Sequence, residues 1–149
     1  MLQRCSALAY SLMRIVAGAL FACHGAQKLF GALGGKIEIH DAEGLIAGLV
    51  ELFGGSLISL GIFTPIAAFV ASGEMAVAYF KAHAPRGFWP ILNRGEQAAL
   101  YCFVFLFIAC QGDGRWSVHA LWTRYFRHNT SLEARQGPKA NSIPQKKHR

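Results

Sequence analysis

Four long apolar segments follow one another along the chain, separated by short turns or polar loops. They cover residues 8–30, 44–63, 65–83 and 96–112. A helix needs about 20 mostly apolar residues to cross a bilayer. The pattern predicts an all-α protein in which residues 1–114 form an antiparallel four-helix transmembrane bundle.

The first segment carries cations although it is otherwise apolar. Its small and basic residues recur at alternating steps of four and three, which places them on one face of a helix. This face consists of Ala7, Ser11, Arg14, Gly18, Phe21, Gly25 and Lys28. Charged groups inside a span usually face the protein interior rather than lipid. We therefore expect neighbouring helices to supply groups that interact with Arg14 and Lys28.

The second and third segments repeat this arrangement with a carboxylate on each small-residue face. The two faces are Gly44, Gly48, Glu51 and Gly55, and then Ala67, Ala71, Glu74, Ala78 and Lys81. The G-x-x-x-G spacing of Gly44 and Gly48 allows helices to approach closely in a membrane. Three successive helices with ionisable groups on such faces predict a shared polar interior.

The turns between segments also have specific signals. Gly61 suits a helix end, Thr64 an N-cap and Pro65 the first helical position, so the second and third segments should form an antiparallel hairpin. We interpret residues 84–95 as an interfacial loop. In the fourth segment, either of two sets of residues could face the protein interior. They are Ala98, Cys102, Phe105 and Ala109, or Glu96, Ala99, Phe103 and Cys110.

The carboxyl-terminal part differs in composition. The apolar and basic faces of residues 115–128 predict a basic amphipathic helix lying in the membrane interface. The lack of periodicity in residues 129–149 predicts a disordered tail. After Gly112 the chain has eight Lys and Arg against two acidic residues, which is nearly the whole net charge of +7. The positive-inside rule places this end in the cytoplasm, and four spans then place the N-terminus there too.

Composition excludes some classes of protein. Hydrophobic residues make up 53% of the chain and charged residues 15%, whereas a soluble domain has about 25% charged residues. Because the basic residues belong to no folded basic domain, we expect no nucleic-acid partner. The four cysteines lack metal-site spacing, so no metal site is predicted. Arg14 interrupts the apolar run of a signal peptide, so we expect the first segment to be retained.

Helix depth and side-chain direction predict two charged clusters in the interior. One pairs Arg14 with Glu74. The other joins His24 and Lys28 with Glu51, and Glu96 is a further candidate for it. Two roles stay open for these residues: a polar cavity for a proton, a quinone headgroup or a small anion, or ion pairs that only hold the bundle together.

Several short motifs together resemble the DoxX family. They are Arg14-x-x-x-Gly18, His24-Gly25-x-x-Lys28-Leu29-Phe30-Gly31, Glu51-Leu52-x-Gly54-Gly55, Leu60-Gly61-x-Phe63-Thr64-Pro65, Asn93-x-Gly95-Glu96 and Gly112-x-Gly114-Arg115-Trp116-Ser117. The resemblance implies a small four-helix protein of the bacterial inner (plasma) membrane. Named members are linked to thiosulfate:quinone oxidoreduction or to membrane complexes with thiol and superoxide enzymes, and the resemblance transfers no catalytic residue.

These observations favour a membrane subunit or partner of an oxidoreductase system, with the charged interior as a pocket for a quinone or another small ligand. The chain shows no flavin, haem or nucleotide fingerprint, so electron transfer would need a partner protein. Two alternatives remain: a transporter of a small solute or protons, and a membrane scaffold that recruits a cytoplasmic enzyme. Whether the protein is itself an enzyme stays open.

Overall fold

The structure is a computed structural model that describes residues 2–123 and residue 125. This part of the chain is helical throughout and has no strand. The elements are α1 (Leu2–Phe30), η1 (Ala32–Gly34), α2 (Ala42–Leu49), η2 (Val50–Gly54), α3 (Gly55–Leu60), α4 (Thr64–Ala78), η3 (Tyr79–His83), η4 (Ala84–Arg86), α5 (Pro90–Asn93) and α6 (Glu96–Gln111). A further helical stretch covers residues 118–123.

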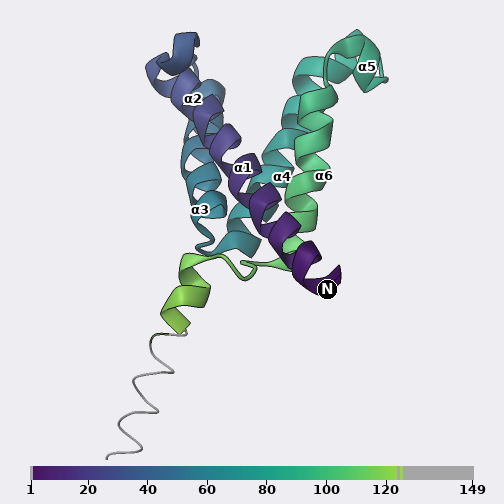
Figure 1. Ribbon diagram of the computed structural model, residues 1–149. Helices are drawn as coiled ribbons and strands as arrows, with labels where there is room; N and C mark the ends of the chain where they lie inside the picture. The colour runs from purple at the N-terminus through teal and green to yellow at the C-terminus, as the bar shows by residue number, and fades with distance from the viewer. Residues whose placement is uncertain (1, 124, 126–149) are drawn as a thin grey trace, which may run out of the picture.

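The long helices form a V (Figure 1). One arm consists of α2, η2 and α3 with the second half of α1, and the other consists of α4, η3 and α6. The arms meet at the end where the N-terminus and residues 112–123 lie, which we call the closed end. They separate at the opposite end, which we call the open end. The order of the four helical segments and their alternating directions agree with the sequence prediction.

Small residues hold the first arm together. Gly18 and Gly25 of α1 face the backbone of α3 and of α2 and η2. A Cβ atom on Gly18 would lie 2.6 Å from the Ser59 nitrogen, and one on Gly25 would lie 2.7 Å from the Gly48 oxygen. Both distances are too short for a side chain. The small-residue faces of the first and second segments are therefore the surfaces on which α1 packs against α2, η2 and α3.

The core lies where the two arms meet. Phe21, Ile58, Phe105 and Ile108 are fully buried there, together with small residues of α4. Phe21 and Phe105 pack edge to face with ring centroids 4.7 Å apart. Because Ala98 and Phe105 are buried and Phe103 is exposed, the first of the two faces considered for the fourth segment is the inner one.

Two wide turns interrupt the regular helices. Residues of η2 and η3 form π-helical turns inside the second and third helical segments. Such turns are rare and frequently occur at functional sites. η2 contains Glu51, and η3 contains Lys81 and His83, so both wide turns bear ionisable side chains.

Several boundaries differ from the sequence prediction. The first helix begins at Leu2 rather than near residue 8. The N-cap prediction for Thr64 is wrong: Phe63 precedes the helix, the Thr64 hydroxyl has no partner, and Asp113 accepts a hydrogen bond from the Thr64 nitrogen at 3.1 Å. The expected interfacial loop contains the short helices η4 and α5. The predicted disordered tail, residues 129–149, lies outside the described residues.

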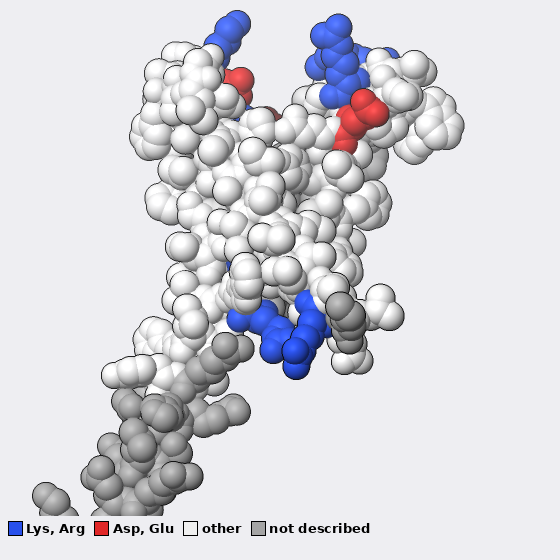
Figure 2. Space-filling model, viewed as in Figure 1, with Lys and Arg blue, Asp and Glu red and all other residues white. Residues whose placement is uncertain are grey.

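The outer surface of the long helices is strongly apolar. Leu20, Phe53, Phe69 and Phe103 are each more than half exposed. On the face drawn in Figure 2, charged side chains gather at the two ends and the middle is almost free of them. Within the described residues, two helical segments are long and apolar enough to cross a membrane, Leu2–Phe30 and Ala42–Leu60, and Glu96–Gln111 is a shorter apolar helix.

Candidate functional site: a charged cleft at the open end

The open end contains a cleft between the two arms, which we call the main cleft. Its volume is about 960 Å³, and Figure 2 shows the hollow between the arms. Its walls are mostly apolar and come from α2 and Val50 on one side and from α4 on the other; they include Ile46, Ala47, Val50, Val70, Val77 and Ala78. This combination of apolar walls and a few polar groups is typical of ligand sites.

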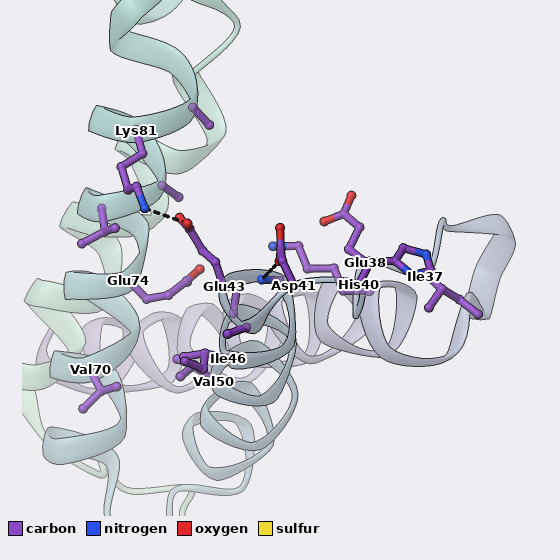
Figure 3. A pocket seen from close by; sticks show the side chains of 17 residues that line it. Ile37, Glu38, His40, Asp41, Glu43, Ile46, Val50, Val70, Glu74 and Lys81 are labelled. Atoms are coloured by element: carbon purple, nitrogen blue, oxygen red, sulfur yellow. Dashed lines mark hydrogen bonds and ion pairs between the residues drawn. The ribbon is translucent and has the colours of Figure 1, made fainter.

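Charged residues surround the main cleft (Figure 3). Lys81 of η3 and Glu43 of α2 form an ion pair of 2.7 Å across its mouth, and both side chains are well exposed. Glu74 points from α4 toward α2 below this pair. Asp41 caps α2 by accepting a hydrogen bond from the Gly44 nitrogen at 2.7 Å. The mouth is therefore bridged by charges, and a third carboxylate lies further inside.

A partly buried ion pair lies at the edge of the main cleft. Lys28, near the end of α1, donates a hydrogen bond of 2.8 Å to Oε1 of Glu51. The Glu51 side chain is 4% exposed, and its Oε2 has no hydrogen-bond partner. Lys28 and Glu51 were placed in one cluster by the sequence, and this pairing is confirmed.

A second, smaller cavity lies on the other side of this ion pair, and we call it the side cavity. It has a volume of about 210 Å³, and α1 and α6 contribute most of its wall. His24 lines it and is hydrogen-bonded to Gln97 at 2.7 Å. Lys28 lines both cavities, so the Lys28–Glu51 pair lies between them.

The closed end contains the other buried cation, Arg14. Its guanidinium donates hydrogen bonds to the carbonyl oxygens of Ile58, Ser59 and Trp116. The last carbonyls of a helix lack partners within that helix, so the end of α3 is a suitable acceptor for a cation. The expected Arg14–Glu74 pair is wrong, because the terminal nitrogens of Arg14 donate to backbone carbonyls and Glu74 lies at the main cleft.

The segment after α6 is fixed at this closed end. Tyr10 donates a hydrogen bond to the Gly112 carbonyl, and Asp113 accepts one from the backbone of α4. Ser117 caps the following helical stretch by accepting a hydrogen bond from the Ala120 nitrogen at 3.0 Å. Arg14 and these contacts thus hold residues 112–117 against the bundle.

Comparison with known proteins identifies the family. The DoxX family model matches residues 9–84, just over half of the chain. The chain belongs to the DoxX family. It is also similar to an uncharacterized protein of Haemophilus influenzae, with 41% identity over 111 residues, which cover 70% of this chain and 83% of that protein. No solved structure matches it.

Membership of the DoxX family and the apolar helices suggest a membrane protein that contacts the lipid bilayer. Every residue that lines the main cleft lies within the matched segment 9–84. Arg14, His24 and Glu51 lie within it as well. Glu96 falls outside it, is exposed in the first turn of α6, and lines neither cavity.

The sequence did not reveal several residues of the side cavity. They are His83, Arg94, Gln97 and Tyr101. Gln97 and Tyr101 are one helical turn apart and follow the inner face of α6, so deciding that face would have pointed to them. Arg94 lies in a left-handed conformation after α5, which no periodic pattern predicts. Within the described residues, no group of three or more His, Cys, Asp or Glu could hold a metal ion.

Proposed function

We propose that this DoxX protein binds a small amphiphilic molecule of the quinone class in the main cleft. The observation that carries the proposal is the combination of an apolar cleft of about 960 Å³ with Lys28 and Glu74 among its lining residues. Ligand sites commonly measure roughly 300–1,000 Å³ and place a few polar groups in mostly apolar walls.

The chemistry of the lining residues fits a quinone headgroup. A quinone carbonyl oxygen accepts hydrogen bonds, and the Lys28 ammonium is a donor. Glu74 can exchange a proton with a bound headgroup, while Ile46 and Val70 offer apolar contact to a ring or tail. The cleft therefore supplies both a polar and an apolar part, as an amphiphile requires.

The proposal places all four helical segments across the bacterial inner (plasma) membrane as one multi-pass bundle. Both described ends of the chain lie at the closed end, as an even number of spans requires (Figure 1). Basic residues concentrate after Gly112, so the positive-inside rule places the closed end in the cytoplasm. The main cleft then opens near the outer surface of the membrane.

In this role the protein is a membrane subunit or partner of an oxidoreductase system. Support comes from the family resemblance and from a cleft suited to a quinone. The partner protein would carry the redox centre, and this chain would hold the quinone within its reach.

Binding of decylubiquinone and menadione to the full-length protein in lipid nanodiscs tests the proposal. We expect Lys28→Met and Glu51→Gln to weaken binding at least tenfold, because a charged hydrogen bond to the ligand or to its donor is lost; about 1.4 kcal/mol corresponds to tenfold. Exposed Lys36→Met and Glu96→Gln are the matched controls, with unchanged affinity. Equal affinity of Lys28→Met, Glu51→Gln and wild type would reject the quinone site.

A scaffold function is the second candidate, and the closed end favours it. Arg14 and Asp113 fix the segment that leads into the helical stretch 118–123, so this stretch leaves the bundle from a defined position. Co-purification of a cytoplasmic enzyme that is lost when the region after Gly114 is deleted would support the scaffold. Retention of the partner by the truncated protein would exclude it.

A further inference from the structure

The interior of the open end contains more acidic groups than cations. Lys28 binds one oxygen of Glu51, and the other oxygen of Glu51 is buried without a partner. Glu74 also has one buried oxygen, Oε2, without a partner. Glu74 and Lys28 both line the main cleft. One ammonium therefore faces two carboxyl groups.

The remaining charged groups do not provide the missing positive charge. Lys81 is paired with Glu43 at the exposed mouth. Nε2 of His24 is hydrogen-bonded to the side chain of Gln97 at 2.7 Å rather than to Glu51 or Glu74. The other ionisable groups that line the two cavities are Glu38, His40, Asp41, His83, Arg94 and Tyr101. The acidic ones among these add negative charge, and Arg94 is exposed.

A buried carboxylate without a compensating charge is costly, and such a group takes up a proton instead. A proton also turns one acceptor oxygen into a donor, which gives an unpartnered oxygen the means to form a hydrogen bond. We propose that Lys28, Glu51 and Glu74 form a binding site for one exchangeable proton, held by Glu74 while Lys28 is paired with Glu51.

The two cavities give this site a route for exchange. Glu74 lines the main cleft and Glu51 lines the side cavity, whereas Lys28 lines both. If Lys28 turned from Glu51 to Glu74, the same charge balance would move the proton to Glu51. Movement of Lys28 between the two glutamates would thus transfer the proton from the main cleft to the side cavity. It goes beyond the quinone proposal and does not depend on it, because no ligand enters the charge count.

Infrared spectroscopy of the full-length protein in lipid nanodiscs at pH 7 tests the site. The carbonyl stretch of a protonated carboxyl group is absent from carboxylates, and its intensity is calibrated against the acidified protein. Wild type should show one protonated carboxyl. Glu74→Gln should show none, and Glu51→Gln should also show none because Lys28 then pairs with Glu74. Lys28→Met should show two, because no cation remains.

Glu96→Gln is the matched control and should retain the single protonated carboxyl. Circular dichroism establishes that each variant keeps its helix content. Because Glu74→Gln and Glu51→Gln test the site independently, the test still works if one of them fails to fold. A wild type without the band, or a band unchanged in both Glu74→Gln and Glu51→Gln, overturns the proton site. Absence of quinone binding by the wild-type protein, with the band pattern intact, would reject the quinone proposal alone.

Discussion

Arg14 and Lys28 are both cations on the same face of α1, yet the protein uses them in different ways. Arg14 is 0% exposed and donates to backbone carbonyls at the closed end. The Lys28 side chain is 27% exposed and is paired with Glu51 beside two cavities. Arg14 binds carbonyls of the kind that every helix end has, whereas Lys28 binds one acidic side chain, that of Glu51.

The difference separates a structural charge from a candidate site. The planar guanidinium offers five donors in fixed directions, which suits it to bridge the carbonyls of Ser59 and Trp116. It also joins the end of α3 to the segment after α6. At the open end the unpartnered buried atoms are carboxyl oxygens, of Glu51 and Glu74, whereas at the closed end they are Nε of Arg14 and the Thr64 hydroxyl. A buried polar group without a partner in a folded protein calls for a ligand, a proton or water.

The largest expected effect is on stability at the closed end. Arg14→Met removes the donor to three carbonyls and should lower the free energy of unfolding by about 3–5 kcal/mol, since breaking buried charged interactions costs this much. Unfolding in detergent, followed by circular dichroism, measures the loss. Arg4→Met, at an exposed position of the same helix, is the control. A loss below about 1 kcal/mol would contradict the structural role of Arg14.

The second effect concerns the contact of α1 with its own arm. Gly18→Ala and Gly25→Ala should each cost about 1–3 kcal/mol, because the added methyl group meets backbone atoms. Gly73→Ala, where the added Cβ meets open space, should be neutral or stabilising because alanine favours the helix. Thermal unfolding compares the three variants. Equal stability of all three would show that the interface relaxes easily.

The third effect distinguishes the two cations directly. Lys28→Met leaves Glu51 without its partner, but uptake of a second proton limits the loss, so it should cost less than Arg14→Met. The double variant Lys28→Met/Glu51→Gln should recover about 1–3 kcal/mol relative to Lys28→Met, because position 51 then no longer has to take up a proton on folding. Chemical unfolding of the single and double variants measures this coupling. No recovery would mean that the pair does not determine stability at the open end.

The smallest effect is expected at the mouth of the main cleft. Lys81 and Glu43 are both well exposed, and exposed ion pairs contribute about 0–1 kcal/mol. Lys81→Met should therefore change the free energy of unfolding by less than about 1 kcal/mol, and Glu43→Gln should match it. The same unfolding assay tests both variants. A loss as large as that of Lys28→Met would place the mouth pair among the structural contacts.

The sequence predicted the helices and the inner face of the first helix well. The α1 face contains Ser11, Arg14, Gly18, Phe21 and Gly25, and these five residues are all buried. Strong helical periodicity makes such faces readable. The Lys28–Glu51 pair was also predictable, because side chains lean toward the N-terminus of their helix and the two helices are antiparallel.

Other features could not be predicted for physical reasons. The Arg14–Glu74 prediction considered only acidic side chains as partners, whereas the carbonyls at the end of α3 were equally good acceptors. The side cavity depended on which face of α6 points inward, and two faces fitted the pattern. The separation of the two arms at the open end arises from tertiary packing, which no local pattern encodes.

The wide turn η2 has a consequence for the length of the chain. A π turn contains one residue more than an α-helical turn, and successive α-helical residues are rotated by about 100°. A chain lacking Leu52 or Phe53 would continue as a regular α-helix, and α2 with Glu51 would rotate relative to α3 and to α1, which packs on α3. A single-residue deletion here should move Glu51 away from Lys28 without changing any side chain that lines the cleft.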